Sequence, residues 1–398
     1  MATLLVLAAG PLQVPAITTA KRMGLRVVAA DGSAEAPGLA LADVARVVNI
    51  LDPEACLAVA REERVDGVIH ICSEVSMFAM GRINEELGLK GLDSATAVRA
   101  TNKEKMRRAF EAGGAPSPRS IGAATLEEAR TAAAEIGPPL ILKPSRNSGS
   151  RGVTRLMEPD AAALEQAFAY ALGESRDRSV VVEEFVEGPE FSVEILTWQG
   201  QPRVLQVTDK QTTGAPHFVE TGHSQPAGAS AADRWALEQA AIKGVRALGI
   251  DWAGSHAELR LTRRGPMIIE IGARLGGDFI TTELAPRSTG IDMVEGAINL
   301  ALGRVPDLTP RRPAGGSAIR YLCPRPGRVV SIHGLERARA LPGVKIVDVE
   351  VEVGGVVPEM KSSLLRVGHV IAEGDTAVQA VANAEAGRDA IHIVTRPE

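Results

Sequence analysis

Hydrophobic and polar positions alternate in blocks along the first hundred residues, and the blocks have the lengths of strands and helices. Three apolar stretches have strand length: TLLVLAAG (3–10), LRVVAAD (25–31) and DGVIHICS (66–73). Amphipathic stretches over about 14–23 and 53–65 separate them. Strands that alternate with helices favour parallel pairing. We therefore expect a parallel α/β domain over residues 1–100.

Two residues of this region raise the alternative of a dinucleotide site. Gly10 follows the first predicted strand, and Asp31 ends the second one. The glycine-rich fingerprint is absent, because Leu12 and Pro15 stand where glycines are needed. Nicotinamide binding is therefore the weakest of the candidate functions.

The pattern changes near residue 100. In TNKEKMRRAFEAGGAP, Thr101 and Glu104 predict a capping box at the start of a new helix, which the glycines at 113 and 114 end. Hairpins and helices mix from there to about residue 305. The segment PDLTPRRPAGG (306–316) then separates a final part with strands and one helix at about 376–386. The predicted domains are therefore 1–100, 101–305 and 306–398.

Two acidic residues interrupt the apolar pattern of a predicted hairpin. The strands SHAELRL (255–261) and MIIEIG (267–272) flank the turn TRRGP. If the turn centres on Arg264, Glu258 lies opposite Glu270 on one face, with Cβ atoms about 5 Å apart. Facing carboxylates repel each other unless a cation lies between them, and an all-oxygen site suits Mg²⁺. The alternative is an exposed face on which Glu258 contacts Arg260 or Arg264.

Small residues after a strand suggest a site for phosphate. The strand that ends in Lys143 precedes a loop whose backbone N–H groups can approach phosphate oxygens, with Ser145, Asn147, Ser148, Gly149, Ser150 and Gly152. Lys103 stands in the first turn of a helix, where a cation opposes the helix dipole unless an anion binds nearby. A flexible turn and a solvated lysine are the alternatives.

Two further stretches contain candidate ligands of a small molecule. VVVEEFVEGPEFSVEIL (180–196) joins two strands by an acidic linker, where free backbone groups can hold adenine and Glu183 or Glu190 can hold a ribose. We interpret Glu187 and Glu194 as solvated acids. FVETGH (218–223) is predicted to be a loop that carries Glu220 and His223, and a lone histidine in a loop is usually solvated. Arg320 lies in an apolar strand and needs a partner, either a substrate anion or a structural carboxylate.

Composition excludes several classes of function. A net charge of −5 with 3% aromatic residues lacks the basic, stacking surface of nucleic-acid binders. No apolar run approaches the ~20 residues of a membrane helix, so we expect no membrane partner and a cytoplasmic location. The spacing of the three cysteines, Cys56, Cys72 and Cys323, is typical neither of a metal site nor of a disulfide framework, so we expect them to be reduced. Small molecules are the expected partners.

Taken in order, Lys103, Lys143 with its loop, the EEFVEG linker, and Glu258 and Glu270 followed by Arg274 resemble the ATP-grasp superfamily over essentially the whole chain. The stretches VETGHSQPA and IEIGARLGGDF are most similar to carboxylate–amine ligases of the L-amino acid ligase type. The resemblance implies the fold class α/β (α+β), with an N-terminal parallel pre-ATP-grasp domain and a central antiparallel sheet. It also implies a mobile lid at about 120–185 and a C-terminal extension that completes the grasp domain.

The resemblance also implies roles for individual residues. Lys103, Lys143 and the 145–152 loop, with Ser148, Gly149 and Ser150, would hold the phosphates of ATP. Adenine and ribose would contact Glu183, Glu184, Val186 and Glu190. Glu220 and His223 would contact the amino-acid substrate. Glu258 and Glu270 would bind Mg²⁺, for which Mn²⁺ can substitute, and Arg274 would stabilise the oxyanion or anchor a carboxylate. The usual asparagine two residues after the second acid is Gly272 here, which leaves the number of metal ions open.

The implied reaction activates an amino acid or similar acid as an acylphosphate and transfers the acyl group to an amine, with release of ADP and phosphate. One alternative is a purine-pathway or carboxylase-like enzyme that uses bicarbonate or a ribosylamine. Another is an ATP-binding sensor without turnover. A homodimer is a further expectation.

Overall fold

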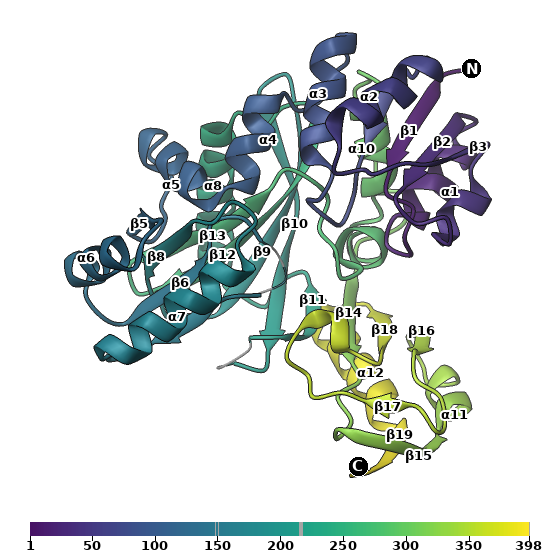
Figure 1. Ribbon diagram of the computed structural model, residues 1–398. Coiled ribbons are helices and arrows are strands. Elements are labelled where there is room, and N and C mark those ends of the chain that lie inside the picture. The colour runs from purple at the N-terminus through teal and green to yellow at the C-terminus, as the bar shows by residue number, and fades with distance from the viewer. Residues whose placement is uncertain (148, 150, 215–217, 398) are drawn as a thin grey trace.

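The computed structural model describes residues 1–147, 149, 151–214 and 218–397 of the chain. Its strands form four sheets, and Figure 1 shows how they are arranged. No helix of the described residues combines the length and the apolar character that a bilayer span requires.

The N-terminal sheet has four parallel strands in the order β3-β2-β1-β4, which confirms the predicted pairing. Its strands are β1 (Thr3–Leu7), β2 (Arg26–Asp31), β3 (Val44–Val47) and β4 (Gly67–Ile69). The helices of this region are α1 (Val14–Arg22), α2 (Pro53–Glu62), α3 (Met77–Leu87) and α4 (Ser94–Thr101). Both faces of β1 are buried, which explains its unbroken apolar run.

Asp31 has a structural partner at the end of this sheet. Its carboxylate accepts hydrogen bonds from the backbone N–H groups of Ala9 and Ser33, both at 2.8 Å. These two hydrogen bonds give Asp31 a structural role at the end of β2. The nicotinamide alternative thereby loses one of the two residues on which it depended.

A smaller antiparallel sheet has the strand order β5-β8-β6-β7. Its strands are β5 (Ser120–Ala123), β6 (Leu140–Pro144), β7 (Thr154–Leu156) and β8 (Val180–Glu184). Helices α6 (Leu126–Ile136) and α7 (Ala161–Glu174) pack on it and share a core of their own, which includes Leu142, Phe168 and Val182. A separate core is what a lid needs in order to move as a unit. Its motion stays a prediction.

The largest sheet has eight antiparallel strands in the order β13-β12-β9-β10-β11-β14-β18-β16. The first five in sequence are β9 (Glu190–Trp198), β10 (Gln201–Thr212), β11 (Glu220–Gln225), β12 (Ala253–Thr262) and β13 (Gly265–Gly272). The other three come from the C-terminal part of the chain: β14 (Gly316–Tyr321), β16 (Val344–Val349) and β18 (Gly368–Gly374). The C-terminal segment therefore continues the central sheet.

The remaining C-terminal elements form a small sheet beside this one (Figure 1). It contains β15 (Gly327–His333), β17 (Val356–Val357) and β19 (His392–Arg396), and α11 (Leu335–Arg339) lies in the same region. Helix α12 (Ala377–Asp389) packs on the large sheet through Ala380 and Ala384. It matches the helix predicted at about 376–386.

One hydrophobic core joins the N-terminal sheet to the large sheet. It extends from Leu5 and Met77 through Phe110 to Val193 and Ile271. Helices α5 (Lys103–Ala112), α8 (Ala231–Leu248) and α10 (Met293–Ala301) lie between or beside the two sheets. Because Phe110 is fully buried there, its truncation to alanine should cost about 3–5 kcal/mol. This shared core fixes the N-terminal residues relative to the central strands.

The capping-box prediction at Thr101 is wrong. Helix α4 includes Thr101, whose hydroxyl donates to the Ala97 carbonyl at 2.7 Å. Helix α5 begins at Lys103 instead, and the Asn102 side chain caps it by accepting from the Lys105 N–H at 2.9 Å. Asparagine is as good an N-cap as threonine, so the sequence offered two starts one residue apart.

Candidate active site

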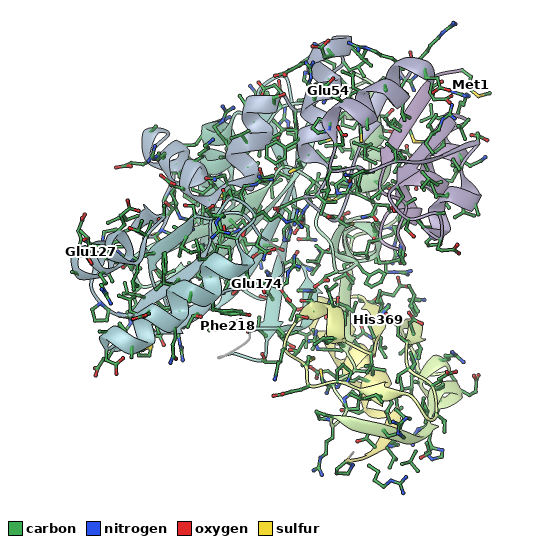
Figure 2. The ribbon with its side chains drawn as sticks, viewed as in Figure 1. Met1, Glu54, Glu127, Glu174, Phe218 and His369 are labelled. Atoms are coloured by element: carbon green, nitrogen blue, oxygen red, sulfur yellow. The ribbon has the colours of Figure 1, made fainter. Side chains whose placement is uncertain are left out.

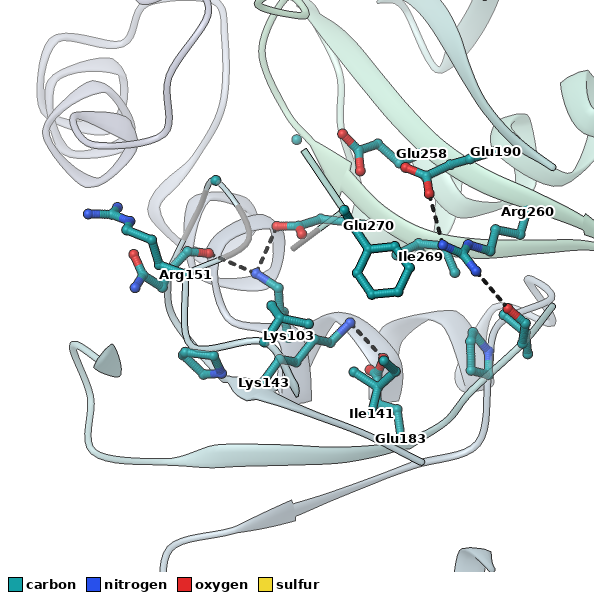
Figure 3. A pocket seen from close by; sticks show the side chains of 18 of the residues that line it. Lys103, Ile141, Lys143, Arg151, Glu183, Glu190, Glu258, Arg260, Ile269 and Glu270 are labelled. Atoms are coloured by element: carbon teal, nitrogen blue, oxygen red, sulfur yellow. Dashed lines mark hydrogen bonds and ion pairs between the residues drawn. The ribbon is translucent and has the colours of Figure 1, made fainter. Parts of the chain in front are cut away.

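A cavity lies between the small four-stranded sheet and the large sheet, and Figure 3 shows it from close by. Strands β6 and β8 contribute Lys143 and Glu183 to its lining, and β12 and β13 contribute Glu258 and Glu270. The segment after β4 adds Glu74. Charged side chains therefore converge from three parts of the chain.

Glu258 lies opposite Glu270 across the β12–β13 hairpin, as predicted, but the register is reached differently. The turn holds two residues, so Thr262 pairs with Gly265 and Leu259 with Ile268. Continued unchanged, this register would set Glu258 against Ile269. A β-bulge adds one residue to β13 and shifts the register. Both carboxylates therefore line the cavity.

Each carboxylate of the pair has a lysine partner. Lys103 Nζ lies 3.0 Å from Glu270 Oε1 and donates to the Asn147 carbonyl at 2.9 Å (Figure 3). Lys210 Nζ lies 2.9 Å from Glu258 Oε1. Both lysines are buried. Burial disfavours their charged forms, but the facing glutamates outweigh it and raise the pKa of each lysine.

Three side chains, Glu258, His256 and Glu194, form a connected row that leads from the cavity into the protein. His256 Nε2 lies 3.2 Å from Glu258 Oε1, and its Nδ1 lies 2.9 Å from Glu194 Oε1. Burial alone would lower the pKa of His256, but Glu194 raises it to about 9. His256 is therefore an imidazolium at neutral pH. The interpretation of Glu194 as a solvated acid is wrong, because this side chain is fully buried.

Lys143 is held by a second buried pair. Its Nζ lies 2.6 Å from Glu183 Oε2, and Arg107 Nε donates to Glu183 Oε1 at 2.9 Å. Burial opposes ionisation of Glu183, yet Arg107 and Lys143 hold its pKa at about 2. Burial lowers the pKa of Lys143 to about 8. Lys103, for which a solvated position was the alternative, is likewise buried beside this cluster.

The linker between β8 and β9 forms the opposite wall. Glu184 pairs with Arg264 at 2.5 Å, and the Val186 carbonyl accepts from Arg260 at 3.1 Å. Glu190 lies 3.2 Å from Arg260 (Figure 3) and 3.1 Å from Lys210. These contacts anchor the linker at three residues and so hold its backbone in one conformation along the cavity wall.

The Ser/Gly loop after β6 is described only in part. Ser148 and Ser150, predicted to contact phosphate, lie outside the described residues. Gly149 lines the cavity and has a φ of +67°, a backbone conformation that favours glycine. Asn147 and Arg151 line the cavity as well. The described part of the loop therefore lies at the cavity beside Lys143, as the prediction of a phosphate site requires.

Arg274 and Glu74 meet at the end of β13. Arg274 lines the cavity, and its guanidinium lies 3.5 Å from Glu74 Oε1. Burial and the nearby Glu270 raise the pKa of Glu74. A Cβ added to Gly272 would lie 3.1 Å from Glu74 Oε1 and 3.2 Å from the Arg274 guanidinium. Glu74 and Arg274 therefore occupy the space that a side chain at position 272 would need.

The stretch that contains Glu220 and His223 is a strand, β11, and the prediction of a loop was wrong. Pairing with β10 on one side and β14 on the other satisfies its backbone despite its polar composition. Glu220 lines the cavity and accepts from Ser363 at 2.6 Å. His223 is buried, and its Nε2 lies 3.4 Å from Asp278, which also binds Arg366 at 2.6 Å.

Arg320 pairs with a structural carboxylate. Its Nε lies 3.2 Å from Glu385 on α12, and its guanidinium also donates to the His223 carbonyl at 3.2 Å. Among the described residues that line the cavity, Glu220 is present, and His223 and Arg320 are absent. The salt-bridge alternative therefore describes the observed surroundings of Arg320.

Four site residues were missed from the sequence: Glu74, Arg107, Lys210 and His256. Glu74 follows the parallel strand β4, and the carboxyl ends of parallel strands often carry functional residues, so this signal was available. Lys210 lies in the polar stretch 209–212 at the end of β10, and His256 stands two residues before Glu258 on β12. Strand alternation alone places His256 on the face of Glu258. Only the sheet order places Lys210 beside Glu258 and Glu194 beside His256, so no local pattern separates these residues from solvated ones.

Two family models match the chain. One, described as an ATP-grasp domain, matches residues 136–283, and the other, described as L-amino acid ligase C-terminal domain 2, matches residues 320–396. Together with the fold, these matches define the chain as one that carries an ATP-grasp domain. More particularly, residues 320–396 match the L-amino acid ligase C-terminal domain 2 model.

Curated relatives include proteins of different function. A Sinorhizobium fredii protein, named as uncharacterized protein y4rH, is 32% identical over 74% of this chain and 61% of its own length. Alanine–anticapsin ligase of Bacillus subtilis is 29% identical over 59% of this chain and 54% of its own. Formate-dependent phosphoribosylglycinamide formyltransferase of Synechococcus elongatus is 34% identical over 50% and 51%. The chain thus spans between 51% and 61% of the length of these relatives.

Similarity to a solved structure covers the whole chain. The crystal structure of L-amino acid ligase from Bacillus licheniformis has a TM-score of 0.84 and 24% identity, over 100% of this chain and 99% of that one. This likeness shows the fold, and the predicted ATP-grasp fold class is confirmed.

Proposed function

We propose that the chain is an ATP-dependent carboxylate–amine ligase that joins an amino acid or similar small acid to an amine and releases ADP and phosphate. One observation carries the proposal. The facing carboxylates Glu258 and Glu270 line the same cavity as the lysines Lys103 and Lys143 and the arginine Arg274. The ATP-grasp match and the L-amino acid ligase C-terminal domain support the same conclusion.

The nucleotide would lie between the two sheets. Lys143, Lys103 and the loop with Gly149 supply positive charge and backbone N–H groups at one side of the cavity, where phosphates would bind. Glu184, Val186 and Glu190 lie at the linker wall, where adenine and ribose would bind. Glu183 keeps Lys143 and Arg107 in place and so would act on the phosphates through Lys143.

The donor atoms of the site suit Mg²⁺. Glu258 and Glu270 offer carboxylate oxygens, the ligands this ion prefers, and Mn²⁺ accepts the same set. Glu74 offers a third carboxylate beside Gly272, where the usual asparagine is missing. When bound, Mg²⁺ would supply charge neutralisation of the phosphate oxygens. Residues Glu258, Glu270 and Glu74 would hold it.

The chemistry needs two steps, and the chain has residues for both. A carboxylate oxygen of the substrate attacks the γ-phosphorus, ADP leaves, and Lys103 and Lys143 offset the charge that moves with the phosphoryl group. The amine then attacks the acyl carbon, phosphate leaves, and the amine loses a proton. Arg274 lines the cavity beyond the metal strand and would stabilise the oxyanion of this second step.

Single substitutions test this assignment. Glu270→Ala and Arg274→Ala should each lower ADP formation by about 10²-fold or more, because each removes a charge that acts on the transition state. Glu187→Ala and Arg263→Ala are matched controls, since both side chains are exposed. Near-normal turnover of Glu270→Ala or Arg274→Ala, with the thermal unfolding midpoint unchanged, would reject the proposal.

A second candidate is a purine-pathway type of ligase. The 34% identity to a formate-dependent phosphoribosylglycinamide formyltransferase favours it. ADP formation that depends on formate or bicarbonate, and not on amino acids, would establish this candidate. A sensor without turnover would bind ATP and form no ADP with any acid.

A further inference from the structure

A second group of potential metal ligands lies at the edge of the large sheet. Asp348 and Glu350 belong to β16 and the residue after its end, and His369 belongs to the neighbouring strand β18. Strand β16 is the last strand of the sheet. Figure 2 shows His369 in the C-terminal part of the molecule. None of the three residues lines the cavity described above.

The strand register brings the three side chains together. His369 is the direct cross-strand partner of Asp348, and Glu350 follows Asp348 by two residues. Cross-strand partners and residues two apart share a face of a sheet. One nitrogen of His369 and one oxygen from each acid lie within 4.8 Å of one another.

His369 is buried and directed toward the two acids. It is 3% exposed, and its ring makes no hydrogen bond to another residue in the described part of the chain. The ring stacks on Phe279, with ring centres 4.4 Å apart and planes 30° apart, and Tyr321 lies edge-on at 6.2 Å. These aromatic contacts fix the plane of the imidazole. Its polar edge therefore has the acids as its neighbours.

Neither carboxylate has an ion-pair partner in the described part of the chain, although the positive charge of Arg366 lies near enough to oppose the rise that burial and Asp348 cause in the pKa of Glu350. Within the described ranges, no lysine, arginine or histidine forms an ion pair with Asp348 or Glu350 at 4.0 Å or less. Two adjacent carboxylates repel each other, and an imidazole without a hydrogen bond to the protein forgoes the stabilisation that a partner would supply. A bound cation would relieve both costs at once.

We propose that Asp348, Glu350 and His369 bind a divalent transition-metal ion of the Zn²⁺ type. One imidazole nitrogen with two carboxylate oxygens suits Zn²⁺, whereas Mg²⁺ prefers oxygen ligands alone. Both acids are exposed and can rotate inward to the bond lengths of about 2.0–2.2 Å that Zn²⁺ requires. The ion would join the edge strand β16 to β18, which protects an edge from other pairing. This site is independent of the ligase proposal.

Calorimetric titration with Zn²⁺ tests the site. The experiment uses the full chain with Glu270→Gln as background, so that Zn²⁺ binding in the cavity is reduced. His369→Gln should bind one equivalent of Zn²⁺ less than the background protein. Asp348→Asn combined with Glu350→Gln, which keeps the buried ring and changes only exposed groups, should show the same loss. Glu352→Gln, an exposed acid two residues further on, is the matched control and should bind as the background does.

A second measurement separates metal binding from folding. Zn²⁺ should raise the thermal unfolding midpoint of the background protein and of Glu352→Gln, because a ligand stabilises the state that binds it. It should leave the midpoint of the Asp348/Glu350 double variant unchanged. Equal Zn²⁺ stoichiometry in the background protein and the double variant would overturn the proposal. A background protein that binds no Zn²⁺ would overturn it as well.

Discussion

Gly272 leaves room for the carboxylate of Glu74. A Cβ on residue 272 would stand 3.1 Å from Glu74 Oε1, closer than ordinary packing allows. Glu74 lies between β4 and α3, and Gly272 is the last residue of β13. The glycine therefore lets the segment after β4 place a carboxylate beside β13, the strand that carries Glu270.

This relationship predicts that Gly272→Asn lowers activity, although it restores the asparagine usual in similar proteins. The new side chain would displace Glu74 and Arg274, and a shift of about 1 Å can cost on the order of 10²-fold in rate. The measurement is kcat/KM for ADP formation. Gly173→Asn is the control, because nothing lies within 4 Å of a Cβ at that position.

A double-mutant cycle sharpens this test. If Glu74 and residue 272 compete for one space, Glu74→Ala should cost less in the Gly272→Asn protein than in the wild type. Equal costs in the two backgrounds would show that the residues act separately.

Glu194 is predicted to control the charge of His256. Glu194→Gln removes the carboxylate that raises the pKa of His256 to about 9, so this pKa should fall toward or below the usual ~6.5. The charge of His256 then no longer supports the Glu258 carboxylate at neutral pH. NMR titration of the imidazole protons measures the change. An unaltered His256 titration in Glu194→Gln would contradict the role given to this buried pair.

The pH dependence of ATP use should report Lys143. Its pKa is lowered to about 8, so the ammonium that would hold phosphate is lost as the pH rises through 8. The value of kcat/KM for ATP should therefore fall by about tenfold per pH unit above this pKa. Lys143→Arg, which stays charged, should have a lower but flatter profile between pH 7 and 9. A wild-type profile as flat as that of Lys143→Arg would exclude phosphate binding by this lysine.

Protein stability in acid should depend on His70. Burial lowers its folded-state pKa to about 4, whereas an unfolded histidine titrates near 6.5. Above pH 6.5 neither state binds the proton. As the pH falls from 6.5 to 4, only the unfolded state binds it, which should cost about 3 kcal/mol of folding free energy. Urea unfolding at pH 7 and pH 4 should show this loss in the wild type relative to His70→Asn. Parallel losses in both proteins would contradict it.

The sequence predicted the parts of the site that local patterns encode. Alternation along two strands and one turn was enough to set Glu258 opposite Glu270, although a two-residue turn and a compensating bulge were not foreseen. A turn and a bulge each shift the register by one residue, and their effects cancelled. The predicted pairing of Glu258 with Glu270 is therefore correct, but it depends on a turn length and a bulge that the hydrophobic pattern alone does not show.

Other site residues depend on strand order, which local patterns do not encode. Lys210 meets Glu258 because β10 and β12 both lie beside β9 in the large sheet. Glu194 was predicted to be solvated because its strand has polar residues on alternate positions. It is buried because a charged histidine from β12 lies opposite it. Burial of a paired charge leaves the same sequence pattern as solvation of a free one.

The most direct test of the proposed ligase measures ADP release with ATP and Mg²⁺ against amino acids, singly and in pairs, with hydroxylamine as a substitute amine. An acyl phosphate formed in the cavity would react with hydroxylamine, so the proposal predicts ATP-dependent hydroxamate formation with at least one acid. Glu270→Ala should form none. ATP binding by the wild type without ADP or hydroxamate from any acid would contradict the ligase assignment.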